Sequence, residues 1–294
     1  MKTSPCIKII NGVEIPFIGL GTYPMKGDIL GKAVACAMDS GYRLYDSAWY
    51  YQNEKDLGLF FKSSNIPRDE LFITSKLKAE QYLGRRRYLH LDKKSVLKCY
   101  DETLNRYGVD YIDLYLMHSH IDWYMEAYND ILELYEQGRI RAIGACNCTI
   151  EQLRRFKSMH GVYPMVNQVE MHPYYNRLEL VDFCNENQIV LQAFSPFAHG
   201  DYLRELLNNK VLQGLSQKYN KTIGQIILRW FVQRNISVIP QSSNPIHIKE
   251  NIDIFDFELQ DSEVNDINSL NRNTSYGSFS QKRAKKIFGI TIKH

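Results

Sequence analysis

Short apolar segments alternate along the chain with longer segments in which apolar residues recur at helical spacing. The short segments are rich in β-branched and aromatic residues and are bounded by turn-forming residues, which is typical of buried β-strands. Eight strands are predicted in this way, at residues 17–22, 43–46, 71–75, 112–118, 142–145, 165–170, 190–194 and 238–240.

Amphipathic helices are predicted between these strands, among them residues 28–41, 93–108, 127–138 and 149–161. Each of the four ends on glycine, the residue that most readily takes the left-handed conformation after a helix. Ahead of the first strand, Asn11-Gly12 lies between two runs of β-branched residues, which predicts a β-hairpin with a two-residue turn.

The order of these elements predicts the fold class. Strands that are each followed by a helix favour parallel pairing with crossover connections. A chain of 294 residues could form two average domains, but eight strand–helix units fit one (β/α)8 TIM barrel better than two open sheets. We therefore predict a single domain, residues 1–294, with an N-terminal β-hairpin and a C-terminal tail (residues 272–294) over the active-site face.

Composition narrows the class of function. Hydrophobic residues make up 44% and charged residues 23%, and the net charge of +3 is too small to favour a nucleic-acid or membrane partner. The basic run 85–87 is expected to be a solvated loop, with contact to an anionic substrate as the alternative. Six scattered cysteines show neither C-x-x-C nor zinc spacing, so we expect a reduced, cytoplasmic chain without a metal. Neither a secretory signal nor a membrane span is expected.

In such a barrel the active site lies at the C-terminal ends of the strands. Polar and titratable residues gather at the predicted strand ends: Tyr23, Asp46, Lys76, His118, Cys146, Asn147, Gln168, Glu170, Ser195, Gln241 and Ser242.

Four residues near these ends form a candidate catalytic group. Asp46, Lys76 and His118 end three consecutive predicted strands, and Tyr51 lies in the turn after Asp46. Taken singly, each has an ordinary explanation, such as packing, helix capping or exposure to water. Taken together, a buried ammonium would lower the pKa of Tyr51 from about 10, and the imidazole would donate to a substrate oxygen. This chemistry suits protonation of an alkoxide as hydride reaches a carbonyl carbon, which implies a nicotinamide cofactor.

No G-x-G-x-x-G follows a predicted strand, so a Rossmann site is not supported. The segment "SVIPQSSNPIHIKEN" (residues 237–251) instead joins a strand end to a helix start through Ser242, Ser243 and Asn244. Such a turn is suited to an anion, yet no Lys or Arg precedes Lys249 in it. These residues alone do not identify the anion.

The chain resembles the aldo-keto reductase family in several ordered segments. "GYRLYDSAWYYQNEKDLG" and "VDYIDLYLMHS" are similar to family signatures, and "MVNQVEMHPYYNRLELVDFC" and "FDFELQDSEVNDINSLNRN" follow family segments. The resemblance extends through at least residues 6–275. It implies a (β/α)8 reductase of aldehydes or ketones that binds NADP(H) or NAD(H) in an extended form.

On this resemblance, Asp46, Tyr51, Lys76 and His118 match the catalytic tetrad, with Tyr51 rather than Tyr50 as proton donor. Asn147 and Gln168 would hold the nicotinamide carboxamide, residues 195–197 would follow the pyrophosphate, and Ser242 and Asn251 would contact the adenosine end. The full cofactor set is Gly21, Thr22, Tyr23, Asp46, Cys146, Asn147, Gln168, Phe194, Ser195, Pro196, Phe197, Gln241, Ser242, Ser243, His247 and Asn251.

The chain departs from the family pattern in three respects, at four positions. Cys146 replaces a usual Ser and is a weaker hydrogen-bond partner. Phe194 replaces a Tyr, which keeps the stacking face without the hydroxyl. Gln241 and His247 stand where members that favour NADPH carry Lys and Arg for the 2′-phosphate, and neither is fully charged near neutrality. We therefore predict a weakened preference for NADPH, with NADH used well or even preferred.

The substrate cleft is predicted to be lined by aromatic residues. The sequence does not distinguish between small, sugar-type and steroid-type carbonyl substrates. Its expected lining is Tyr23, Trp49, Tyr50, Tyr51, His118, His120, Trp123 and Tyr124. One alternative is a non-catalytic, cofactor-binding regulatory subunit, which predicts an eroded tetrad. A second is a Schiff-base enzyme, against which a permanently charged Lys76 argues. A monomer is expected.

Overall fold

The computed structural model describes residues 3–77, 93–118 and 125–275. Its strands are β1 (Cys6–Lys8), β2 (Glu14–Pro16), β3 (Gly19–Gly21), β4 (Leu44–Asp46), β5 (Phe72–Leu77), β6 (Ile112–Met117), β7 (Ile140–Cys146), β8 (Val166–Glu170), β9 (Val190–Phe194) and β10 (Ser237–Val238). Its helices are α1 (Gly27–Asp39), α2 (Glu54–Ser63), α3 (Lys93–Tyr107), α5 (Tyr128–Glu136), α6 (Ile150–His160), α7 (Leu178–Glu186), α8 (Gly200–Leu207), α9 (Lys210–Tyr219), α10 (Ile223–Gln233), α11 (Pro245–Ile252) and α12 (Asp261–Asn268), with 3-10 turns η1 (Trp49–Tyr51) and η2 (Arg68–Glu70).

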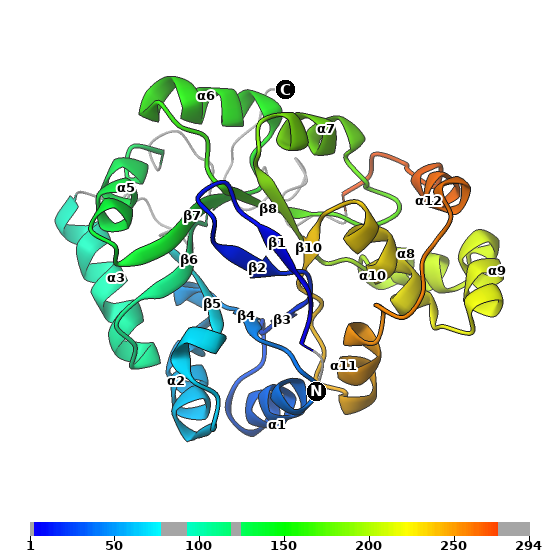
Figure 1. Ribbon diagram of the computed structural model, residues 1–294, viewed down its shortest axis with the longest axis horizontal. Helices are drawn as coiled ribbons and strands as arrows, with labels where there is room; N and C mark the ends of the chain where they lie inside the picture. The colour runs from blue at the N-terminus through cyan, green and yellow to red at the C-terminus, as the bar shows by residue number, and fades with distance from the viewer. Residues whose placement is uncertain (1–2, 78–92, 119–124, 276–294) are drawn as a thin grey trace.

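Strands β3 to β10 form one parallel sheet in sequence order, and the helices surround it (Figure 1). Single bridges join Ile18 to Val238 and Gly21 to Gln241, so the two edge strands meet and the sheet nearly closes into a barrel. The predicted (β/α)8 fold is confirmed, with β9 at its predicted bounds and the other strands within two residues at either end. The four predicted glycine ends also hold, since each has a positive φ, between 66° and 95°.

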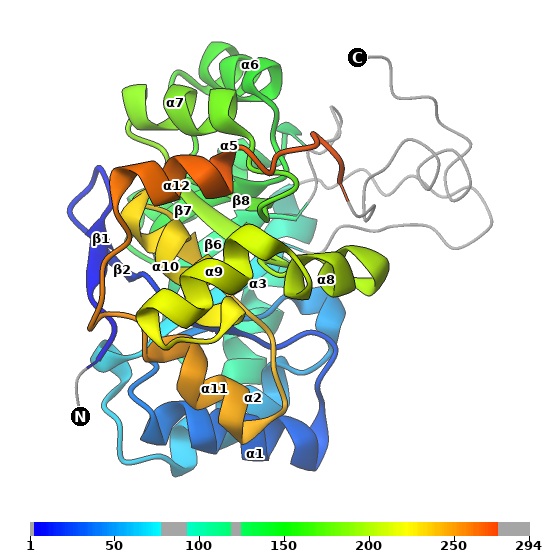
Figure 2. The same ribbon diagram turned by 90° about the vertical axis from the view of Figure 1, so that its right-hand side faces the viewer.

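The hairpin of β1 and β2 lies across the N-terminal end of the barrel (Figures 1 and 2). Its predicted two-residue turn is wrong. The strands stop at Lys8 and Glu14, and Gly12 N–H donates to the Ile9 carbonyl at 2.8 Å. Ile9 N–H donates to the Val13 carbonyl at 2.7 Å, so the loop spans the three residues 10–12, and Gly12 has a φ of 88°. Ile9 itself is 2% exposed and packs with the barrel interior.

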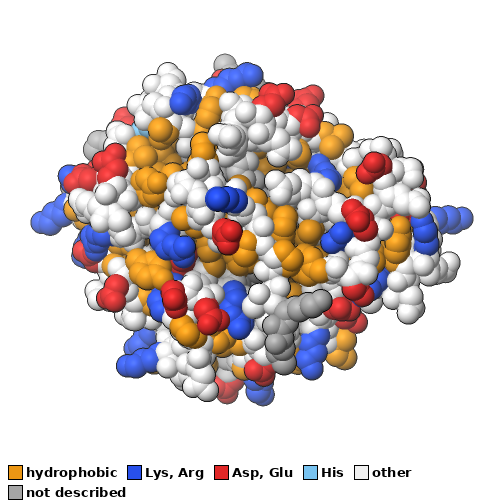
Figure 3. Space-filling view, viewed as in Figure 1, with side chains coloured by type: hydrophobic (Ala, Val, Ile, Leu, Met, Phe, Trp, Pro, Cys, Tyr) orange, Lys and Arg blue, Asp and Glu red, His pale blue; other side chains and the backbone are white. Residues whose placement is uncertain are grey.

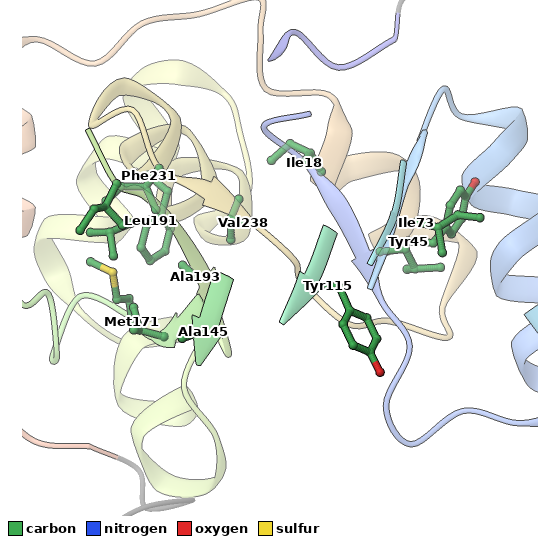
Figure 4. Packing of buried hydrophobic residues seen from close by; sticks show 14 of the residues in the cluster. Ile18, Tyr45, Ile73, Tyr115, Ala145, Met171, Leu191, Ala193, Phe231 and Val238 are labelled. Carbon is green, nitrogen blue, oxygen red and sulfur yellow. The ribbon is translucent and has the colours of Figure 1, made fainter. Parts of the chain in front are cut away.

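Two layers of apolar side chains alternate along the strands, as a period of two requires. One layer fills the barrel interior beneath the hairpin: Leu44, Phe72, Leu114, Leu116, Val166, Val190 and Ile239 with Ile7, Ile9 and Ile15. The other layer lies between the strands and the helices, where Phe231 of α10 packs beside Leu191 and Val238 (Figure 4).

The surface around the hairpin carries positive and negative side chains scattered among apolar ones (Figure 3). Within the described ranges, no helix combines the length and the apolar character needed to cross a membrane.

Candidate functional site

Lys76 is the buried centre of a polar group at the C-terminal ends of β4 and β5. Its side chain is 1% exposed, and its Nζ donates to Asp46 Oδ1 at 2.7 Å and to the Ser47 carbonyl at 2.7 Å. Asp46 is 4% exposed at its side chain. A buried ammonium is stable only when it is paired and hydrogen-bonded, and both conditions are met here.

Tyr51 reaches this group from η1, the turn that follows β4. Its ring centroid lies 5.0 Å from Lys76 Nζ and 5.9 Å from the ring of His118. On its other side the Tyr23 ring lies at 4.9 Å. Tyr50 is 49% exposed and points elsewhere, so the geometry selects Tyr51 of the two neighbours.

Asn53 holds the turn that carries Tyr51. It is fully buried, and its Oδ1 accepts from Ser47 Oγ at 2.5 Å. Its Nδ2 donates to the carbonyl of Met25 at 3.0 Å and lies within 3.3 Å of both oxygens of Thr22. One amide therefore ties η1 to the loop after β3, which brings Tyr23 beside Tyr51.

The electrostatics of Tyr51 differ from the sequence-based expectation. Burial raises the pKa of Tyr51 more than the nearby Lys76 ammonium lowers it, and the pKa stands at about 12. The expectation of a net lowered pKa was therefore wrong, because it considered the charge and not the desolvation. Burial also acts against the charge of Lys76, but the attraction of Asp46 and then of Tyr51 outweighs it and raises the pKa of Lys76, which keeps its charge.

His118 follows β6 and is half-buried. Burial, and then the charge of Lys76, lower the pKa of His118 to about 3. The imidazole is therefore neutral at pH 7. A neutral ring can donate one N–H to a substrate oxygen without adding a second positive charge to the site.

The end of β7 and the middle of β8 bring Cys146, Asn147 and Gln168 together. Cys146 pairs with Gln168 in the register of β7 and β8, and Asn147 N–H donates to the Gln168 carbonyl at 2.8 Å. Burial raises the pKa of the Cys146 thiol to about 12, so the thiol stays protonated. Gln168 Nε2 donates to Asp46 Oδ2 at 2.7 Å, a contact that links this group to the tetrad and that the sequence did not reveal.

Non-glycine residues in the left-handed conformation mark these loops. Asn147 has a φ of 57°, Ser195 of 53° and Ala198 of 54°. Such conformations are uncommon for side-chain-bearing residues and concentrate at functional sites. Phe194 and Phe197 are half-buried around them, Pro196 is buried, and Ser195 Oγ lies 2.8 Å from His199 Nε2.

The anion-type turn lies between β10 and α11, beside β3. Gln241, Ser243 and His247 are exposed there, as is Asn244. Ser242 Oγ already accepts from the N–H of Asn244 at 3.0 Å, and Asn244 Oδ1 accepts from the N–H of Ile246 at 3.0 Å. Asn251 is 6% exposed on the inner side of α11. Two N–H groups of the turn are thus already bonded within it, and the turn has no Lys or Arg of its own.

Trp49 is held by α3, which the sequence did not reveal. Its Nε1 donates to Glu102 Oε2 at 2.9 Å, and the Arg106 guanidinium lies 4.6 Å from its ring centroid. Arg106 in turn donates to the buried Glu54 at 3.1 Å. A spacing of four residues on α3 places Glu102 and Arg106 on one face, and this was the only signal in the sequence.

Several predicted residues lie outside the described ranges: His120, Trp123, Tyr124 and the basic run 85–87. Among the described residues, no three His, Cys, Asp or Glu side chains are grouped so as to hold a metal.

A family model described as "Aldo/keto reductase family" matches residues 18–272 of the chain. The chain belongs to this family. It is 38% identical over 273 residues to a glyoxal reductase of Bacillus subtilis, covering 92% of this chain and 94% of that protein. It is 35% identical over 280 residues to the methylglyoxal reductase DkgA of Escherichia coli K12, covering 94% and 97%. A solved aldo-keto reductase of Bombyx mori in complex with NADP has a TM-score of 0.85 at 31% identity, covering 96% and 98%.

This aldo-keto reductase is therefore a nicotinamide-dependent oxidoreductase that reduces carbonyl compounds, and the regulatory-subunit alternative is not favoured. The described residues fit such a cofactor. Gln168 is buried within β8, the half-buried Phe194 ends β9, and the loops after both β7 and β9 contain residues in uncommon conformations.

Proposed function

We propose that Tyr51 is the proton donor of the carbonyl reduction and that Asp46, Lys76 and His118 complete the catalytic group. The observation that carries this proposal is the buried Lys76 ammonium, bonded to Asp46 at 2.7 Å and facing the Tyr51 ring. A pKa of about 12 keeps the phenolic proton in place at neutral pH. Lys76 then stabilises the tyrosinate that proton transfer leaves behind. The neutral His118 donates to the carbonyl oxygen and orients it.

We further propose that Asn147 and Gln168 hold the nicotinamide carboxamide, while Phe194 lies against the nicotinamide ring. When bound, the reduced cofactor supplies the hydride to the carbonyl carbon. Gly21 at the end of β3 would border it, with Thr22 and Tyr23 in the following loop and residues 195–197 in the loop after β9. Gln241, Ser242, Ser243, His247 and Asn251 would surround the adenosine end.

For the cofactor, we propose a weakened preference for NADPH. Each charge-assisted hydrogen bond to a phosphate contributes about 1.5–3 kcal/mol, or roughly ten- to hundredfold in affinity. Gln241 is a neutral amide, and the N–H groups of Asn244 and Ile246 are already bonded within the turn. The ratio of kcat/KM with NADPH to that with NADH should stay below about ten. A strong preference for NADPH would refute this proposal.

Two substitutions test the same point by restoring cations. Gln241→Lys combined with His247→Arg should shift the kcat/KM ratio towards NADPH by at least about tenfold. Gln213→Lys is the matched control, because it adds a positive charge at an exposed position of α9. If the double variant behaves like the control, the phosphate of NADPH binds elsewhere.

As substrates we propose small aldehydes that carry a second carbonyl group. The relatives named glyoxal reductase and methylglyoxal reductase support this choice, as does the aromatic pair of Tyr23 and Tyr51 at the site. A panel of glyoxal, methylglyoxal, a keto sugar and a steroid ketone, followed at the nicotinamide absorbance with both cofactors, tests it. The highest kcat/KM for the steroid ketone would overturn the substrate proposal while leaving the reductase activity in place.

We also propose that the chain works as a single-domain monomer in the cytoplasm. No two cysteines in the described part of the chain form a disulfide, which suits a reducing compartment. Light scattering coupled to size exclusion measures the oligomeric state, and a mass of about twice 34.4 kDa would contradict the monomer.

A further inference from the structure

A line of buried hydrogen bonds crosses the barrel interior from the N-terminal hairpin to the catalytic group. Ser237 Oγ donates to the Pro16 carbonyl at 2.9 Å, and Gln192 Nε2 donates to Ser237 Oγ at 3.2 Å. Gln168 Nε2 then donates to Gln192 Oε1 at 2.8 Å and to Asp46 Oδ2 at 2.7 Å. The residues whose side chains form this line are each at most 3% exposed.

The two ends determine the direction of every bond in the line. A carbonyl oxygen such as that of Pro16 can only accept, and so can the Asp46 carboxylate that is paired with Lys76. The Ser237 hydroxyl must therefore donate its one hydrogen bond to the Pro16 carbonyl and accept a hydrogen bond from Gln192. Gln192 then presents its oxygen, not its nitrogen, to Gln168.

This arrangement uses both amide hydrogens of Gln168. A single bond to Asp46 would leave the amide free to rotate about that contact, whereas two bonds to separate acceptors define its plane. Because the plane of the amide is fixed, the remaining polar atom, Gln168 Oε1, accepts hydrogen bonds from one direction only. Gln192, Gln168 and Ser237 are directly paired in the register of β8, β9 and β10, so the strands themselves hold the acceptor in place.

We propose that Gln192 is a positioning residue for the cofactor: it holds the plane of the Gln168 amide so that Gln168 Oε1 accepts a hydrogen bond from the NH2 group of the nicotinamide carboxamide. This inference rests on the proposed carboxamide contact of Gln168. Gln192 does not touch the cofactor, and it acts only through Gln168.

The positioning role of Gln192 can be tested with two cofactors that differ only in the group on the nicotinamide carbonyl. The 3-acetylpyridine analogue of the oxidised cofactor carries a methyl group where the carboxamide has NH2. Isothermal titration calorimetry gives the ratio of its Kd to that of the natural cofactor. We expect the wild-type protein to bind the natural cofactor about three- to tenfold more tightly, which is the effect of one neutral hydrogen bond. In Gln192→Met the ratio should fall to about one.

Further variants separate positioning from general damage to the fold. Gln225→Met is the matched control, because Gln225 is also a buried glutamine, yet its side chain bonds Thr222 and Asp253 and no residue of this line. Its variant should keep the wild-type ratio. Gln192→Glu should also keep it, because burial favours the neutral carboxyl group, which still offers an acceptor to Gln168. In a Gln168→Met background, Gln192→Met should change the ratio no further.

The outcomes distinguish this inference from the proposed function. A wild-type protein that does not discriminate between the two cofactors would overturn the carboxamide contact itself. A wild-type preference that persists in Gln192→Met would overturn only the role of Gln192. If Gln192→Met does not fold, Gln192→Leu serves for the same measurement.

Discussion

Replacement of Asp46 by asparagine is the sharpest test of the buried ion pair. The substitution keeps the shape of the side chain and removes the charge that faces Lys76 at 2.7 Å, where the two side chains are only 4% and 1% exposed. Breaking a buried pair by removing one partner typically costs about 3–5 kcal/mol, because the other charge is left uncompensated. The amide oxygen of the variant still accepts one hydrogen bond, so we expect a loss of about 3 kcal/mol in the free energy of unfolding at pH 7.

The pH dependence gives this prediction a sign. In the wild-type protein the raised pKa of Lys76 contributes stability that is present below pH ~10.4, the pKa of the unfolded chain, and is lost as the pH rises further. In Asp46→Asn, burial is no longer opposed by the charge of Asp46, the largest of the effects that raise the pKa of Lys76, so this pKa falls below its unfolded value. The variant therefore gains stability as Lys76 discharges, and its deficit relative to wild type should shrink from pH 7 to pH 10.

Urea unfolding followed by circular dichroism measures both effects. Asp201→Asn is the matched control, because Asp201 forms an ion pair with Arg204 in which the side chains are 88% and 81% exposed. That control should change the free energy of unfolding by no more than about 0.5 kcal/mol. If Asp46→Asn behaves like Asp201→Asn, or if its deficit grows towards pH 10, the reasoning about the buried ammonium is refuted.

Two further predictions concern close packing and acid stability. Gly58→Ala on α2 should lower the free energy of unfolding by at least about 1–3 kcal/mol, because the new Cβ would lie 2.3 Å from the backbone oxygen of Tyr107. Gly214→Ala on α9 has open space around it, so it should raise the free energy of unfolding by up to about 1 kcal/mol in the same urea assay. The pKa of His118 is lowered to about 3, so this residue contributes stability that is present above pH ~6.5 and is lost as the pH falls towards 3. The difference in stability between wild type and His118→Gln should therefore change between about pH 3 and pH ~6.5 and stay constant above pH ~6.5.

The sequence predicts the barrel well because its signals are periodic. Each strand segment is short and apolar, and glycine at the ends of α1, α3, α5 and α6 marks a conformation that other residues rarely adopt. Parallel order then brings Asp46, Lys76 and His118 to neighbouring strand ends. The hairpin turn was mispredicted because Asn-Gly also suits a three-residue loop that ends on a left-handed glycine, and the loop 10–12 takes that form with Gly12 at a φ of 88°.

The electrostatics and the supporting contacts of the site depend on distances that no local pattern contains. The balance between burial and charge at Tyr51 needs the depth of the ring as well as the presence of Lys76. The contact of Gln168 with Asp46 joins strands 122 residues apart. Gln192 is visible in the sequence as a polar residue at an inward position of an otherwise apolar strand, where a buried amide needs hydrogen-bond partners.

The central claim is that Tyr51 donates the proton that completes carbonyl reduction. Steady-state kinetics of Tyr51→Phe with methylglyoxal, together with calorimetric binding of the cofactor, test it most directly. The account predicts that kcat falls by a factor of about 10²–10⁴, the contribution of a general acid, while the cofactor Kd stays within about twofold of wild type. An unchanged kcat in Tyr51→Phe would contradict the mechanism.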